Sequence, residues 1–142
     1  MDRILIVDDE FLIRYTLEEG LKDRGYDAYS AATVEEGLEF VRKYHPGVLL
    51  LDNLLENSVG MDEIVNFKNA DEELQVIMMT AYGSVSQAVE ATKRGAYDYI
   101  LKPFDVDEID MLIKRCLEQK RNREVCGILI RIMIRNSLIR SC

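Results

Sequence analysis

The sequence predicts an α/β domain with a five-stranded parallel sheet covered by helices on both faces, a doubly wound arrangement. Short apolar runs of strand length alternate along the chain with segments of helical period, and the strand-like runs are almost continuously apolar. Parallel strands need crossover connections, which place helices on the sheet faces. At 142 residues and 48% hydrophobic, the chain has room for one such domain with its own core.

The first strand is predicted at residues 3–7 (RILIV), a continuous and largely branched apolar run. Ile13, Leu17 and Leu21 then recur every fourth residue until Gly25, and this spacing predicts a helix. The pair forms the first strand–helix unit.

The second unit begins with an alternating strand at 26–31, a pattern typical of a half-exposed sheet edge. A Thr-x-x-Glu capping box at 33–36 predicts the start of its helix, which we expect to end at 45–47 (HPG). The remaining strands are predicted at 48–51, 75–79 and 97–101, each followed by a helix, with helix starts near Met61, Ser84 and Asp105.

Polar residues follow four of the five predicted strands. Asp8 and Asp9 follow the first strand, Asp52 the third, Thr80 the fourth and Lys102 the fifth. Taken singly, each is more often a helix cap, a turn residue or a solvated charge. Together they converge, because ligands of open α/β sheets bind outside the carboxyl ends of the strands.

This set of residues indicates phosphoryl chemistry. Carboxylates ~4 Å apart repel by roughly 4 kcal/mol per pair at an effective dielectric of ~20. A hard divalent cation such as Mg²⁺ relieves the repulsion. Lys102 and Thr80 then supply a positive charge and a donor for phosphoryl oxygens. Because no glycine-rich phosphate loop is present, Asp52 is the candidate nucleophile that takes up the phosphoryl group.

Four segments of the chain resemble the receiver domain of two-component response regulators, and the last two are similar to its nitrogen-regulatory, enhancer-binding branch. They are ILIVDDE (4–10), VLLLD (48–52), VIMMTAYGS (76–84) and GAYDYILKPFD (95–105), and the resemblance covers about residues 2–120. It implies a flavodoxin-like receiver fold with strand order 2-1-3-4-5. We therefore expect a receiver domain at 1–120 and a tail or linker helix fragment at 121–142.

The resemblance also implies residue roles. Asp52 would accept a phosphoryl group from a histidine kinase, with Mg²⁺ held by Asp8, Asp9, Asp52 and the backbone carbonyl of Leu54. Thr80 and Lys102 would contact the phosphoryl oxygens. Thr80 and Tyr99 would form the switch, although strand packing explains Tyr99 equally well. The Lys102–Pro103 peptide bond is expected to be cis.

One loop departs from the family pattern. Asp52 is followed by NLLENSVGMDE, in which Glu56 stands where a proline is usual, about three residues are added, and Glu63 replaces a glycine. Added loop length costs little closure entropy, so the fold should tolerate it. Competition by Glu56 for the cation, with loss of Mg²⁺ affinity, and altered kinase docking are the two hypotheses for this loop.

We expect a regulatory domain rather than an enzyme, with Mg²⁺-dependent self-phosphorylation and slow autodephosphorylation only. Its expected partners are a sensor histidine kinase and, after phosphorylation, a second copy bound through the fourth helix, fifth strand and fifth helix. An aspartate-nucleophile phosphatase and a phosphorylation-independent interaction domain remain alternatives. The phosphatase would need a second acid two residues after Asp52, where Leu54 stands.

Charge and hydropathy exclude other classes. Residues 1–117 hold 24 acids and 12 bases, so this segment should repel nucleic acid, whereas residues 118–142 hold 2 acids and 6 bases. The N-terminal segment lacks an apolar run of membrane or secretory length, which predicts a cytoplasmic protein without a membrane anchor. In the tail, Val125, Ile128, Leu129, Ile132 and Met133 continue the helical spacing, although a disordered terminus is the competing hypothesis.

Overall fold

The computed structural model of the chain describes residues 2–55, 58–81 and 85–135. Strands and helices alternate along it as the sequence predicts. The strands are β1 (Arg3–Val7), β2 (Asp27–Ala31), β3 (Val48–Asp52), β4 (Leu54–Leu55), β5 (Ser58–Val59), β6 (Gln75–Thr80) and β7 (Asp98–Leu101). The helices are α1 (Phe11–Asp23), α2 (Val34–Tyr44), α3 (Gly60–Ala70), α4 (Val85–Lys93) and α5 (Val106–Arg135).

Five strands form one sheet in the order β2-β1-β3-β6-β7, and every pair is parallel. This confirms the predicted order, because β6 and β7 are the fourth and fifth strands of this sheet. The numbering differs because β4 and β5 pair separately as a short antiparallel hairpin directly after β3. The sequence pattern indicated an enlarged loop there but not a hairpin.

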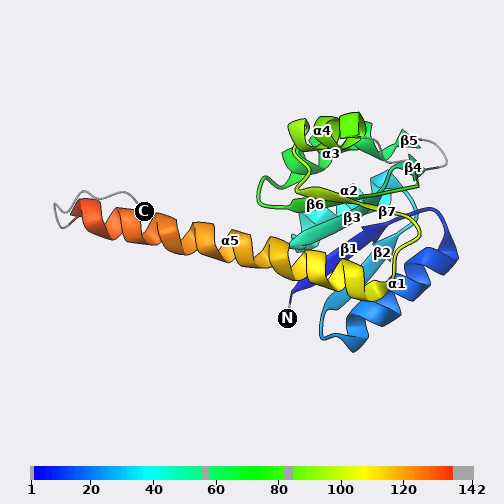
Figure 1. Ribbon diagram of the computed structural model, residues 1–142, viewed down its shortest axis with the longest axis horizontal. Helices are drawn as coiled ribbons and strands as arrows, with labels where there is room; N and C mark the ends of the chain where they lie inside the picture. The colour runs from blue at the N-terminus through cyan, green and yellow to red at the C-terminus, as the bar shows by residue number, and fades with distance from the viewer. Residues whose placement is uncertain (1, 56–57, 82–84, 136–142) are drawn as a thin grey trace.

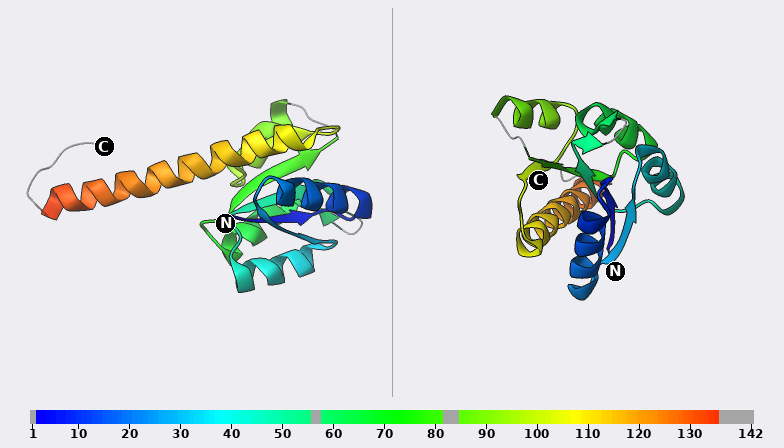
Figure 2. Two further views of the ribbon diagram at one scale, coloured as in Figure 1. Left: turned by 90° about the horizontal axis from the view of Figure 1, so that it is seen from below. Right: turned by 90° about the vertical axis from the view of Figure 1, so that its right-hand side faces the viewer.

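Helices cover both faces of the sheet (Figures 1 and 2). In β1, Ile4 and Ile6 pack toward α1 and α5, whereas Leu5 and Val7 pack toward α2, α3 and α4. All four side chains have no exposed surface. Strands buried on both sides in this way explain the continuous apolar runs in the sequence.

Local capping agrees with the prediction at α2, where the Thr33 hydroxyl accepts a hydrogen bond from the Glu36 N–H at 3.2 Å. The predicted start of α4 cannot be compared in the same way, because Ser84 lies outside the described residues. In α3, Ile64 and Phe67 fill the core, whereas Val65 is exposed.

Helix α5 is longer than the sheet it covers. Its first turns bury Ile109, Ile113 and Cys116 against the sheet, and the helix then continues away from the body of the domain (Figure 1). The Tyr26 hydroxyl donates to Asp110 Oδ1 at 2.7 Å, and this buried contact joins the first turns of α5 to the segment before β2. Helix α5 extends to Arg135, and the division of the chain into a receiver domain and a tail at residue 120 stays a prediction.

Among the described residues, no helix combines the length and the apolar character needed to cross a bilayer.

Candidate functional site

The carboxyl ends of four parallel strands meet at one edge of the sheet. Asp8 follows β1, Asp52 is the last residue of β3, Thr80 is the last of β6, and Lys102 follows β7. The order of strands brings β1, β3, β6 and β7 into adjacent positions, so these residues come together although they are far apart in the sequence. This is the edge where ligands of such sheets bind.

Three carboxylates and one ammonium group form the centre of this edge. One side-chain oxygen from each of Asp8, Asp9 and Asp52 lies within 4.8 Å of the others, with Asp8 and Asp52 buried and Asp9 exposed. Lys102 Nζ lies 3.2 Å from Asp8 Oδ2 and 3.1 Å from Asp52 Oδ1. The single ammonium group therefore bridges the two buried acids.

The protonation equilibria reflect this crowding. Burial, followed by repulsion from Asp8, raises the pKa of Asp52, while hydrogen bonds from Lys102 and from the Leu54 N–H oppose the rise. Burial would lower the pKa of Lys102, but hydrogen bonds and attraction from Asp52 and Asp8 together raise it. The site thus favours the charged form of the Lys102 ammonium group and disfavours the charged form of the Asp52 carboxylate.

Backbone contacts fix the loop that carries Asp8. Its N–H donates to the Ala31 carbonyl at 3.2 Å, its Oδ1 accepts from the Glu10 N–H at 2.9 Å, and its carbonyl accepts from Arg14 Nη1 at 2.7 Å. Arg14 was not among the site residues predicted from the sequence. Its position one helical turn after Glu10 is the signal that could have identified it, because a long side chain there can return to the strand end.

Thr80 and Tyr99 are neighbours beside α4. Both line a small space with Gln87, Ala88 and Ala91, and Tyr99 is half-buried against the core on that face. The Lys102 N–H donates to the Thr80 carbonyl at 2.8 Å, which joins β7 to β6 at the site. The Lys102–Pro103 peptide bond is cis in the structure.

The loop after Asp52 is only partly described. The backbone of Leu54 is one of the groups that lower the pKa of the Asp52 carboxyl. Glu56, the hypothetical competitor for the cation, lies outside the described residues. The Asn53 side chain also contributes to this loop, because its Oδ1 accepts a hydrogen bond from the Met61 N–H at 3.1 Å. This contact was not predicted from the sequence. The signal for it is an amide side chain next to the site and shortly before a helix without its own cap.

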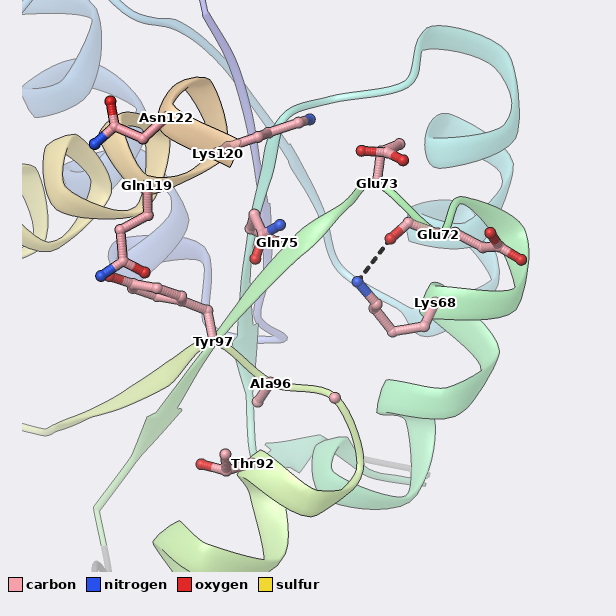
Figure 3. Close-up of a pocket in the computed structure, with 11 residues that line it drawn as sticks. Lys68, Glu72, Glu73, Gln75, Thr92, Ala96, Tyr97, Gln119, Lys120 and Asn122 are labelled. Carbon is pink, nitrogen blue, oxygen red and sulfur yellow. Dashed lines mark hydrogen bonds between the residues drawn. The ribbon is translucent and has the colours of Figure 1, made fainter. Parts of the chain in front are cut away.

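A concave region of about 940 Å³ lies at the other end of the strands, beside the starts of β6 and β7. It is bordered by the α3–β6 turn, the end of α4 and α5 (Figure 3). Both acidic and basic side chains line this region. Lys68 Nζ donates to the carbonyls of Glu72 and Leu74 at 2.8 and 2.7 Å. None of the carboxylate cluster lines it. The chemistry indicated by Asp8, Asp52 and Lys102 therefore belongs to the carboxyl ends of the strands and not to this region.

Comparison with known proteins agrees with this geometry. The family model for the response regulator receiver domain matches residues 4–114. The chain belongs to this family. It is 38% identical over 121 residues to sporulation initiation phosphotransferase F of Bacillus subtilis, a match that covers 85% of this chain and 98% of that protein.

Relatives in the nitrogen-regulatory branch are larger. The receiver is 37% identical over 122 residues to the nitrogen assimilation regulatory protein NtrX of Azorhizobium caulinodans, a match that covers 84% of this chain and 27% of NtrX. This chain thus spans about a quarter of that relative. Among solved structures, the beryllofluoride-activated NtrC4 receiver domain dimer matches with a TM-score of 0.79 and 34% identity, over 84% of this chain and 99% of that one.

Proposed function

We propose that Asp52 is the phosphoacceptor of this receiver domain and that a sensor histidine kinase is the donor. The observation that carries the proposal is the strand-end cluster in which Lys102 bridges buried Asp52 and Asp8. A carboxylate oxygen of Asp52 attacks the phosphorus of a phosphohistidine. The new O–P bond forms as the P–N bond breaks, and the imidazole nitrogen keeps the electron pair and takes up a proton.

The oxygen-rich donor set fits Mg²⁺. Oxygens of Asp8, Asp9 and Asp52 lie within 4.8 Å of one another, and hard carboxylate oxygens are the ligands that this cation prefers. These three residues and the backbone carbonyl of Leu54 would hold it. When bound, Mg²⁺ offsets the repulsion between the Asp52 carboxylate and an incoming phosphoryl group.

Lys102 and Thr80 orient the phosphoryl group in this proposal. The ammonium group of Lys102, which contacts Asp52 at 3.1 Å, engages one phosphoryl oxygen, and the Thr80 hydroxyl donates to another. Because Tyr99 shares its space beside α4 with Thr80, a shift of Thr80 toward the phosphoryl group leaves room for the ring to turn inward. Phosphorylation thereby shifts an equilibrium between two arrangements of this face.

The responding face is formed by α4, β7 and α5. Each element contributes an exposed apolar side chain, namely Val89, Leu101 and Met111, with 47%, 47% and 64% of their surface accessible. The activated NtrC4 receiver, which has the same fold, is a dimer. We expect light scattering to show a dimer of this chain with beryllofluoride and a monomer without it. An unchanged mass would contradict the dimer switch.

A protein donor is supported by the surface beside the site. Phe11, Leu12 and Tyr15 of α1 are 69%, 72% and 54% exposed. Next to them, an apolar groove of about 640 Å³ runs between α1 and the β7–α5 connection that carries Lys102. A small phosphoryl donor such as acetyl phosphate would need no such surface. A kinase domain, in contrast, can bury this apolar surface while it presents its phosphohistidine to Asp52. We also propose a cytoplasmic location for the chain, because the phosphohistidine of a kinase is formed from ATP.

Acetyl phosphate and Mg²⁺, followed by intact mass measurement, test the proposal. The native chain should gain one phosphoryl group, and Asp52→Asn should gain none. Labelling of Asp52→Asn would reject Asp52 as the acceptor, and no labelling of the native chain would favour an interaction domain. Steady release of phosphate from a phosphomonoester would favour the phosphatase, although Leu54 occupies the position where that enzyme class needs a second acid.

A further inference from the structure

Asn53 joins three parts of the structure directly beside Asp52. Its N–H donates to the Met79 carbonyl of β6 at 2.9 Å, and its carbonyl accepts from the Gly60 N–H at 2.7 Å. Its side-chain Oδ1 accepts from the Met61 N–H at 3.1 Å. One residue therefore ties the end of β3 to the neighbouring strand and to the first turn of α3.

Helix α3 depends on this residue for its cap. The first N–H groups of a helix lack partners within the helix, and a polar side chain at the N-cap position usually supplies one. The N-cap position of α3 is Val59, whose side chain makes no capping hydrogen bond. Asn53 fills the role instead, through the Met61 N–H eight residues after it, across the base of the β4–β5 hairpin.

The fit between these segments is close. A Cβ atom on Gly60 would lie 2.2 Å from the Asp52 carbonyl oxygen and 3.0 Å from Asn53 Cα. The start of α3 therefore presses directly on the backbone that carries the acceptor. A displacement of that helix end has to move Asp52 or its neighbours, because close-packed backbone atoms leave no free space.

The geometry points to Asn53 as a positioning residue for Mg²⁺ binding. Its side-chain oxygen holds the first turn of α3 and so sets where the Asp52–Leu54 backbone lies. This inference rests on the proposed function, in which Asp52 and the Leu54 carbonyl are ligands. Leu54 follows Asp52 by only two residues, so a shift of this backbone segment moves both groups together.

The test compares the effects of two lost helix caps on Mg²⁺ affinity. Asn53→Ala removes the cap of α3, and Thr33→Ala removes the cap of α2, which is not joined to Asp52 by such a contact. By titration calorimetry, we expect Asn53→Ala to bind Mg²⁺ about tenfold more weakly, the scale of effect seen for groups that orient metal ligands. Thr33→Ala should keep the native affinity, although both variants lower the urea midpoint. Asn53→Asp keeps the acceptor and should bind Mg²⁺ at least as tightly as the native chain.

A second measurement needs no metal. In EDTA, hydrogen exchange of the Met61 amide should accelerate by about tenfold or more in Asn53→Ala and stay slow in Thr33→Ala, with the reverse result for the Glu36 amide. If Asn53→Ala unfolds, Asn53→Ser replaces it, because its shorter side chain cannot span the same distance. Native Mg²⁺ affinity in the folded variant, or an equal loss in Thr33→Ala, would overturn the inference.

The outcomes separate the two proposals. If the native chain is phosphorylated on Asp52 but Asn53→Ala binds Mg²⁺ normally, only the role of Asn53 is wrong. If the native chain neither binds Mg²⁺ nor becomes labelled, the proposed function fails and the role of Asn53 fails with it.

Discussion

Replacing Asp52 by asparagine should stabilise the fold when divalent cations are absent. Asp52 Oδ1 lies 3.1 Å from Lys102 Nζ, an attraction of roughly 5 kcal/mol at an effective dielectric of ~20. Oxygens of Asp8 and Asp9 lie within 4.8 Å, which gives repulsions of roughly 3.5 kcal/mol each, although solvent weakens the one from exposed Asp9. The attraction and the repulsions nearly cancel. The cost of burying the Asp52 charge therefore decides whether Asp52→Asn raises or lowers the free energy of unfolding.

We expect Asp52→Asn to raise the free energy of unfolding by about 1–2 kcal/mol, because the amide avoids most of that burial cost and can still accept from Lys102. For a chain of this size, the change corresponds to about 3–6 °C in melting temperature. Urea denaturation followed by circular dichroism in EDTA measures it. The exposed Glu39→Gln on α2 is the control, with a change within about 0.5 kcal/mol.

Saturating Mg²⁺ should narrow or reverse the difference in the free energy of unfolding between the native chain and Asp52→Asn. A ligand that binds only the folded state stabilises it by mass action, and the native chain offers one more carboxylate than the variant. The native chain should therefore gain more stability from saturating Mg²⁺ than Asp52→Asn does. An asparagine variant that is no more stable than the native chain in EDTA would refute the reasoning, because burial of the Asp52 charge would then carry no net cost.

Four further predictions follow from contacts at Asp52 and at the start of α5. Tyr26→Phe removes the buried hydrogen bond to Asp110 and should lower the free energy of unfolding by about 1.5–2 kcal/mol in urea titrations, with Mg²⁺ affinity unchanged. Gly60→Ala places a methyl group against the Asp52 carbonyl and should cost about 1–3 kcal/mol and weaken Mg²⁺ binding, as calorimetry would show. Because the folded-state pKa of Asp52 is raised, stability in EDTA should fall as pH rises through that pKa, and the advantage of Asp52→Asn should grow over the same interval. Although burial opposes it, hydrogen bonds from Tyr26 and Lys114 lower the pKa of Asp110, whose contribution is present above the ordinary carboxyl pKa and is lost as pH falls through the folded-state value. Stability curves that run in the opposite directions with pH would contradict these assignments.

The sequence by itself determined the layers of the fold and the location of the site. The period of the apolar residues distinguishes strands from helices, and continuous runs such as 48–51 are diagnostic of strands covered on both faces. Asp52 and Lys102 could be identified because each stands at the end of a predicted strand, and parallel strands share one carboxyl edge. These inferences depend only on neighbours along the chain and on the topology that crossover connections allow.

Only the tertiary structure decided which groups make contact at that edge. Lys102 bridges Asp8 and Asp52 across 94 and 50 residues of sequence, and periodicity carries no information on such a contact. The β4–β5 hairpin and the cap that Asn53 provides to α3 depend on the path of one enlarged loop, which residue spacing leaves open. Local chemistry fixes what a residue can bind, whereas the packing of distant segments fixes what lies within its reach.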